Sequence, residues 1–273
     1  EVNWGHFIID EAQDFPDEMF AALKKIVEFV FSERDPEDRP SMTIFADENQ
    51  RLNEKTNSSI SMILSKINLE ENRIYTLTKN YRNTKQIAKL SRTFYVGLVS
   101  GIPELPDREG EVPILFSGRD VNDSVKFIEN YIRNHENQEI GVIASNDKMR
   151  KKMFNKLQYR FQSHPNISVQ TYGSNDEENN NADDLNFDQV GVVTVLNKQS
   201  CKGLEFDAVF LPELQVVSID PSDEDQFRME MYVMTSRARD ILVLMYSNEG
   251  EGQPAVLSYL PDHNSNLLEY YNG

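Results

Sequence analysis

The chain has 273 residues, of which 28 are basic and 45 acidic, so its formal net charge at neutral pH is −17. With 39% hydrophobic and 27% charged residues, it has the composition of a globular protein with one large or two medium domains. No apolar run approaches the ~20 residues that a membrane-spanning helix needs, so we expect no membrane partner. The single cysteine excludes an intrachain disulfide and favours a reducing, cytoplasmic location.

Short apolar runs alternate with helical patterns along the chain. Apolar residues at every third or fourth position between Pro16 and Phe31, for example, predict a helix. This alternation is typical of a doubly wound α/β protein with mostly parallel sheets, in which ligands bind beyond the carboxyl ends of the strands. The predicted strands are 6–10, 41–47, 73–77, 112–117, 139–145, 167–172, 191–196, 207–212 and 241–247, and the predicted helices are 16–31, 57–66, 84–98, 121–134, 147–161 and 224–238.

The negative charge is distributed unevenly. Residues 174–188 carry six carboxylates and no base, which predicts a mobile surface loop that is dispensable for stability. Residues 72–103 carry six bases and no acid, and residues 148–160 carry six further bases. Such basic segments either contact nucleic-acid phosphates or are solvated helix faces, and the sequence leaves both interpretations open.

The first polar cluster follows the predicted strand 6–10. A buried strand that ends in Asp10 and Glu11 delivers two adjacent carboxylates to one edge of the sheet. In nucleotide hydrolases, one such carboxylate holds hydrated Mg²⁺ and the next orients or deprotonates the attacking water. The alternative is that these acids cap the following helix, because acids favour a helix N-terminus.

Other strand ends also carry polar residues suited to a nucleotide. Gln50, after strand 41–47, could sense a terminal phosphate. Tyr81 offers a flat face for a base, and Arg82 offers a fork for phosphate. The alternatives are an ordinary loop at Gln50 and a helix start capped by Asn83 or Thr84.

Two later segments have the same character. Gly203 permits close approach of a ligand to the backbone, and Lys202 and Glu205 flank it. Arg237 precedes the last predicted strand, where an arginine could act as an arginine finger. Its alternative is a surface ion pair with Asp240.

Five segments in chain order resemble motifs II to VI of superfamily 1 helicases of the UvrD/Rep type. The matching segments are 8–15 (IIDEAQDF), 45–52 (FADENQRL), 77–91 (LTKNYRNTKQIAKLS), 194–212 (TVLNKQSCKGLEFDAVFLP) and 232–244 (YVMTSRARDILVL). The resemblance spans residues 6–247, and KGLEFD is its more specific part. It implies RecA-like lobes with ATP bound in the cleft between them. Residues 1–76 would then be the C-terminal half of a first lobe and 77–249 a complete second lobe, followed by a tail at 250–273.

The resemblance also implies roles for individual residues. Asp10 and Glu11 hold Mg²⁺, and Glu11 is the general base. Gln13 and Gln50 contact the γ-phosphate or its water. Tyr81 stacks on adenine, while Arg82 and Arg237 reach the γ-phosphate from the second lobe. Glu205 binds near the ribose, and the Lys202-Gly203 turn lies between nucleotide and nucleic acid. With the cleft open, Arg82 and Arg237 are expected to be solvated, so that alanine changes stability little, and Arg239 has no phosphate role.

The chain departs from the helicase pattern in several places. It contains no G-x-x-x-x-G-K-S/T, so the phosphate-binding loop of motif I is absent from these residues. Arg51 to Lys55 lack the aromatic residues that usually follow motif III, and Lys198-Gln199 stand where Thr-His is usual. Cys201 falls where a small residue is usual and is interpreted as filler.

The resemblance therefore predicts the C-terminal part of an ATP-dependent DNA helicase or translocase. Its expected partners are single-stranded or partly duplex DNA, bound weakly by this chain, and an N-terminal ATPase segment of the same protein. Without that segment, we expect no hydrolysis of ATP. The alternatives are a helicase-like binding module without turnover and an RNA-directed helicase of the same superfamily.

Overall fold

The computed structural model describes the chain as two compact units. Unit 1 comprises residues 1–78 and 95–103, and unit 2 comprises 79–94 and 104–273. The structure describes residues 5–51, 57–67, 69, 71–98, 101–174, 176, 178–179, 181–187, 189–248 and 253–273. The residues after motif III from 52 to 56, and Glu177 and Asp188 of the acidic loop, lie outside the described residues.

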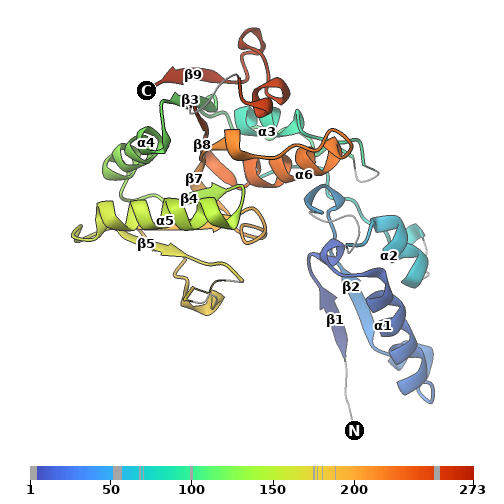
Figure 1. The fold of residues 1–273 in the computed structure, drawn as a ribbon. Coiled ribbons are helices and arrows are strands. Elements are labelled where there is room, and N and C mark those ends of the chain that lie inside the picture. Colours follow the sequence, from blue (N-terminus) through green and yellow to red (C-terminus); the bar gives the residue numbers. More distant parts are fainter. Residues whose placement is uncertain are drawn as a thin grey trace. The chain divides into compact units, whose positions relative to one another are not determined.

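Unit 1 is built around two parallel strands, β1 (His6–Ile9) and β2 (Ser41–Ile44), paired with Ile8 opposite Thr43. Helices α1 (Asp17–Val30) and α2 (Ile60–Ile67) contact each other (Figure 1). Ala12, Phe20 and Ile63 form the centre of a small core. Short 3-10 turns occur at η1 (Ala12–Asp14), η2 (Pro36–Asp38), η3 (Glu48–Gln50) and η4 (Glu71–Arg73).

The predicted strand 73–77 is wrong. Residues 74–78 have no regular secondary structure, and Ile74, Tyr75 and Leu77 are exposed. A strand needs a neighbour to pair its backbone groups, and no described strand pairs with this segment. Apolar composition alone therefore does not specify a strand at this place.

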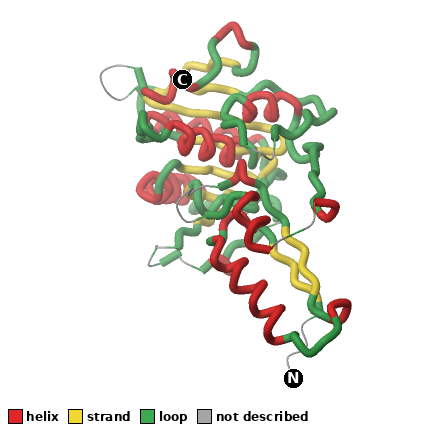
Figure 2. Tube along the Cα trace, turned by 90° about the vertical axis from the view of Figure 1, so that its right-hand side faces the viewer, coloured by secondary structure: helices red, strands yellow, loops and turns green. Residues whose placement is uncertain are grey.

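Unit 2 contains a seven-stranded sheet in the order β5-β6-β4-β7-β8-β3-β9, with every neighbouring pair parallel. Figure 2 shows these strands in yellow with red helices against them. The expected α/β class with doubly wound parallel topology is confirmed, and this architecture is consistent with a RecA-like lobe. The strands are β3 (Ile114–Gly118), β4 (Ile140–Ala144), β5 (Ser168–Thr171), β6 (Val192–Asn197), β7 (Phe206–Leu211), β8 (Ala238–Ser247) and β9 (Glu269–Asn272).

Both faces of the central strands of this sheet are buried, as expected of parallel strands. Phe116, Val142 and Phe210 belong to the core that the sheet shares with α4 (Val121–Asn134) and α5 (Asp147–Phe161). Alternate residues such as Leu115 and Ile143 point to the opposite face and are also buried. The remaining elements are α3 (Lys85–Arg92), α6 (Glu224–Thr235), η5 (Ala182–Asp184), η6 (Leu214–Val216), η7 (Ala255–Tyr259) and η8 (His263–Ser265).

The segment expected to be a tail contributes an edge strand to this sheet. Strand β9 pairs with β3, with Ile114 opposite Glu269. The Tyr271 ring lies 6.4 Å from that of Phe116 and 5.9 Å from that of Phe127 between centroids. Residues 269–272 therefore belong to the fold of unit 2.

No helix among the described residues combines the length and apolar character needed to span a membrane.

Candidate functional site

Parallel pairing in unit 1 brings the predicted motif II and motif III segments together. The Phe45 N–H donates to the Ile9 carbonyl at 2.8 Å, and the Ala12 N–H donates to the Phe45 carbonyl at 2.9 Å. The carboxyl ends of β1 and β2 are thereby held side by side. Asp10 and Glu11 follow the first strand, and the turn at 48–50 follows the second.

Gln13 connects the two segments from a fully buried position. Its Nε2 donates to Glu11 Oε2 at 2.5 Å, and its Oε1 accepts from the Asp47 backbone N–H at 2.9 Å. Because both ends of the amide are engaged, the Glu11 carboxylate is fixed relative to the end of β2. The structure thus brings Glu11 and Gln13 together at the carboxyl end of β1.

Glu11 has an unusual backbone conformation. Its φ of 49° and ψ of 41° lie in the left-handed region, which costs a non-glycine residue on the order of 1–3 kcal/mol. The Glu11 N–H donates to Asp10 Oδ1 at 2.9 Å. Neither acid caps α1, whose N-cap is Pro16 without a side-chain bond, so the structure does not support the capping alternative.

Gln50 lies beside Asp47 on the same turn. Its Nε2 donates to Asp47 Oδ2 at 2.9 Å, and the Asn49 N–H donates to Asp47 Oδ1 at 3.0 Å. Glu48 is buried and accepts from the Ile60 N–H at 2.6 Å, which ties this turn to the start of α2. The turn is therefore a defined structure rather than an ordinary loop.

The acids of unit 1 suit a magnesium ion that is shared with phosphates. Asp10 is exposed, and Glu11 is partly exposed. The described residues contain no group of three or more acidic, histidine or cysteine side chains that could form a full metal cage. Mg²⁺ typically takes one or two carboxylates and completes its shell with water and substrate phosphate, so Asp10 and Glu11 fit that ion.

In unit 2, the segments predicted as motifs IV and VI are joined by hydrogen bonds. Asn83 Nδ2 donates to the carbonyls of Ser236 at 3.0 Å and Ala238 at 2.5 Å. The Thr84 N–H donates to the Arg239 carbonyl at 3.1 Å. Thr84 is also the N-cap of α3, so capping and attachment to the second segment coexist.

Tyr81 is 79% exposed at the start of this segment, so its ring is available for stacking. Lys79 Nζ lies 5.2 Å from the centre of the ring. Arg82, immediately after it, forms an ion pair with Glu205. This contact joins the predicted motif IV to the predicted motif V.

Glu205 is shared between two arginines. Arg239 Nε lies 3.5 Å from Glu205 Oε2, while Arg239 Nη1 donates to Glu139 at 2.7 Å and to Asp207 at 3.2 Å. Partial burial raises the pKa of Glu205, but the charges of Arg82 and Arg239 outweigh it and lower that pKa overall. We call Arg82, Glu139, Glu205, Asp207 and Arg239 the Glu205 cluster.

Sequence reasoning missed the central place of Arg239 in this cluster. It gave Arg239 no phosphate role, and the structure gives that side chain three carboxylate partners. The sequence does show two acids close together, Glu205 and Asp207. They reach Arg239 only because β7 and β8 pair in the folded protein. The alternative of a surface ion pair between Arg237 and Asp240 does not hold either, because Arg237 is buried and Asp240 pairs with Arg108.

Arg237 is buried, which contradicts the expectation that it is solvated. Only 1% of the residue is exposed. Its Nε donates to the Val233 carbonyl at 3.0 Å, and its Nη2 donates to Ser236 Oγ at 3.1 Å. The side chain therefore folds back onto the end of its own helix.

The predicted motif V turn has the backbone that its glycine allows. Gly203 has a φ of +72° and is exposed, with the partly exposed Lys202 before it. Cys201 is fully buried, and burial raises the pKa of its thiol to about 11. An uncharged, inaccessible thiol agrees with the interpretation of Cys201 as filler.

A second buried polar group follows β7. Glu213 is 1% exposed and has a left-handed φ of 56°. Its carboxylate accepts from Ser124 Oγ at 2.7 Å, from Ser247 Oγ at 2.7 Å and from Gln215 Nε2 at 2.8 Å. Hydroxyl and amide donors thus satisfy it, and it connects α4, β8 and η6. Nothing in the sequence pattern had singled it out.

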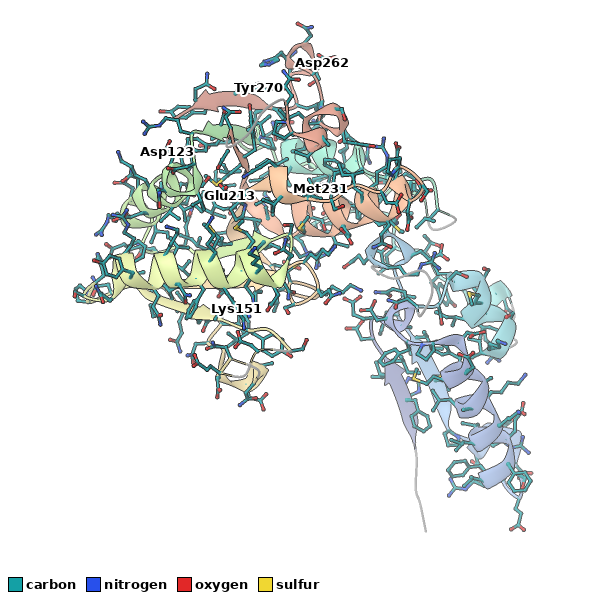
Figure 3. All side chains as sticks on the ribbon, viewed as in Figure 1. Asp123, Lys151, Glu213, Met231, Asp262 and Tyr270 are labelled. Atoms are coloured by element: carbon teal, nitrogen blue, oxygen red, sulfur yellow. The ribbon has the colours of Figure 1, made fainter. Side chains whose placement is uncertain are left out.

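Two residues depart from the sequence-based interpretations of the charged segments: Arg150 does not lie on a solvated helix face, and Asp176 does not lie in an exposed part of the acidic loop. Arg150, from the basic segment, is completely buried and donates to Asp147 at 2.7 Å, Thr171 at 2.6 Å and Asp176 at 2.5 Å. Asp176, from the acidic loop, is buried against it, and this bond lowers the Asp176 pKa to about 2. Lys151, labelled on α5 in Figure 3, lies 3.6 Å from the same carboxylate. We call Arg150, Asp147, Thr171 and Asp176 the Arg150 cluster.

No family model and no curated protein matches this chain. Among solved structures, it is similar to the C-terminal domain of a possible DNA helicase from Lactobacillus plantarum WCFS1, at 19% identity and a TM-score of 0.49, covering 70% of this chain and 98% of that one. It is also similar to arterivirus nonstructural protein 10 (helicase) in complex with DNA, at 11% identity and a TM-score of 0.35, covering 59% of this chain and 35% of that one. Both TM-scores are below 0.5, so these similarities do not assign the chain to a family.

Proposed function

We propose that this chain is the C-terminal part of an ATP-dependent DNA helicase or translocase of superfamily 1, similar to the UvrD/Rep type. One observation carries the proposal. The segments that resemble motifs II to VI occur in the family order, and within each unit their polar residues converge. Glu11 and Gln13 meet the end of β2, and Arg82 meets Glu205.

In unit 1, the proposed chemistry is activation of water. Asp10 and Glu11 would hold Mg²⁺, which when bound neutralises charge on the phosphates. Glu11 accepts a proton from the attacking water at its carboxylate. Gln13 fixes that carboxylate through Nε2 and is itself anchored to the Asp47 backbone. Gln50 contacts the terminal phosphate or its water.

In unit 2, the proposed chemistry is recognition of the nucleotide. The exposed ring of Tyr81 stacks on adenine, and Glu205 binds near the ribose. Arg82 and Arg237 stabilise negative charge on the γ-phosphate. Arg237 must leave its bonds to Val233 and Ser236 to do so, whereas Arg82 has only to exchange a carboxylate for a phosphate.

The Lys202-Gly203 turn lies between nucleotide and DNA in this proposal. Binding of DNA by the chain is expected to be weak and salt-sensitive, because the net charge is −17 and aromatic stacking residues are missing after motif III. Since these residues contain no Walker A sequence, ATP hydrolysis requires a polypeptide that also supplies that loop.

The test is ATP hydrolysis, stimulated by single-stranded DNA, in a polypeptide that combines a Walker A loop with these residues. We expect Glu11→Gln to abolish turnover and Glu28→Gln, an exposed acid on α1, to leave it unchanged. Hydrolysis that survives Glu11→Gln would contradict the proposal. DNA binding without any hydrolysis would favour a binding module, and stronger stimulation by RNA than by DNA would favour an RNA-directed enzyme.

A further inference from the structure

Helix α5 carries two adjacent rows of side chains that repeat every four residues. The inner row is apolar and buried, and it consists of Met149, Met153, Leu157 and Phe161. The outer row precedes it by one residue at each step and consists of Lys148, Lys152, Lys156 and Arg160. We call the outer row the α5 basic ridge.

The inner row fixes the direction of the ridge. Met153 and Leu157 are fully buried in the core shared with the sheet, so the helix cannot rotate about its axis. Lys148 and Lys152 are consequently exposed, Lys156 is partly exposed, and the Arg160 side chain is 46% exposed. Four cations thus follow one line of about 18 Å, at intervals of about 6 Å along the helix. Arg150 does not belong to this line.

A groove between α4 and α5 adjoins the C-terminal half of the ridge, at Lys156 and Arg160. It has a volume of ≈ 380 Å³ and is lined by Asn122, Val125, Asn155, Lys156, Tyr159 and Arg160. Lys156 Nζ donates to Asn122 Oδ1 at 2.7 Å, and the Tyr159 side chain stands out from the helix with 71% of the residue exposed. The groove therefore offers amides, a phenol and two cations.

Carboxylates near the ridge are already engaged with other cations. Glu129 on α4 lies 3.6 Å from Arg160 but pairs more closely with Arg133, at 2.9 Å. Asp123 on α4 pairs with Arg119, and Asp147 and Asp176 both pair with Arg150. Among the described residues, the ridge thus remains a positive strip on a chain of net charge −17.

We propose that the α5 basic ridge and its groove bind the phosphodiester backbone of a nucleic-acid strand. Regularly spaced cations suit a polymer with one negative charge per repeat, and Arg, Lys, Asn and Tyr side chains are common donors to phosphate and sugar. A positive strip on an acidic body also concentrates such a polymer locally. This inference rests on the proposed function for the class of ligand, and it assigns a contact surface outside all of the motif-like segments.

The experiment measures binding of a fluorescent single-stranded oligonucleotide, and of the duplex of the same sequence, to the full chain across a salt series. We expect Lys152→Glu/Lys156→Glu to weaken binding about 10-fold. For a single strand, the slope of the logarithm of the binding constant against the logarithm of the salt concentration should become less negative by about 1.4, since each phosphate contact contributes about 0.7 to that slope. The matched control is Lys24→Glu/Lys25→Glu on α1, which changes the net charge equally at partly exposed and exposed helix positions outside both basic segments. It should alter binding less than about 2-fold. Circular dichroism verifies that both variants fold, and Lys152→Gln/Lys156→Gln repeats the test without new acids.

Each outcome supports or overturns the proposal that the α5 basic ridge binds a nucleic-acid backbone. Equal losses in the ridge variant and the control would overturn it in favour of a net-charge effect. Unchanged binding in both ridge variants would overturn the proposal for the ridge but would not contradict the proposed function. No binding of either oligonucleotide by the wild-type chain would overturn both. Competition by polyglutamate as effective as that by unlabelled DNA would show that the ridge recognises acidic polymers in general, and the phosphodiester assignment would fail.

Discussion

The Arg150 cluster and the Glu205 cluster are both centred on ion pairs between arginine and carboxylate, yet they differ in exposure. Arg150 is completely buried with three partners, and Asp176 closes over it from the acidic loop. The Glu205 cluster is about one-third exposed, and its central carboxylate is divided between Arg82 and Arg239. A closed cluster holds one arrangement, whereas a shared, partly open carboxylate can release one arginine to an anionic ligand. The first is therefore structural, and the second is suited to binding.

The largest expected effect is that of Arg150→Ala. Removing the guanidinium leaves Asp176 buried without its main partner, and breaking a buried pair costs about 3–5 kcal/mol. Denaturant unfolding measures this loss, with Lys152→Ala on the same helix as a control expected to stay within about 0.5 kcal/mol. A loss below about 1 kcal/mol would show that the Arg150 cluster is not closed.

A smaller loss is expected for Arg237→Ala, because its buried guanidinium bonds to Val233 and Ser236. We expect a loss of about 2 kcal/mol in the free energy of unfolding. This replaces the sequence-based expectation of almost no change. An unaltered unfolding midpoint would indicate that Arg237 is solvated after all.

Arg239→Ala is expected to cost about 1 kcal/mol, since a partly exposed network contributes modestly. The substitution should also change the ion pair of Arg82, because Glu205 then has Arg82 as its remaining partner in the Glu205 cluster. NMR of the arginine Nε–H groups should show the Arg82 signal shifting, while Arg133→Ala, which removes the Glu129 pair, leaves that signal in place. The same shift in both variants would argue against a connected Glu205 cluster.

The last expected effect is confined to acid pH. The folded-state pKa of Asp176 is lowered to about 2 from an ordinary value of 3.8, so its contribution to stability is present above pH 3.8 and disappears as pH falls toward 2. Between these values, the wild-type chain should lose stability more steeply than Asp176→Asn. Parallel unfolding curves across that interval would contradict the ion pair.

The sequence was sufficient to predict most of the fold. Helices at 121–134 and 147–161 match α4 and α5 at both ends, because their apolar periodicity faces a core. The prediction of a strand at 73–77 failed because a strand depends on a pairing partner, which local composition does not specify. The edge strand at 269–272 was missed for the converse reason, as its residues are polar and exposed but β3 pairs with them.

The candidate site was predictable in its residue types but not in its contacts. Adjacent acids after a strand and a glycine turn are visible along the chain. Which arginine is buried is decided by pairings over long sequence distances, such as Arg150 with Asp176 and Arg239 with Glu139. A run of bases therefore gave Arg150 and Lys152 the same interpretation, although one lies in the interior and the other faces solvent.

The pairing of β9 with β3 also bears on how unit 2 is assembled. Strand β3 begins at Ile114, and its partner on this edge ends at Asn272, so more than half of the chain must be synthesised before the two can meet. A contact of such high sequence separation forms slowly, and it becomes a short loop closure once β8 has paired with β3, so it belongs after that pairing. Until then, the backbone edge of β3 and the ring of Phe116 remain open to other chains. Strand β9 thus covers an edge of the unit 2 sheet that would otherwise be open to pairing and aggregation.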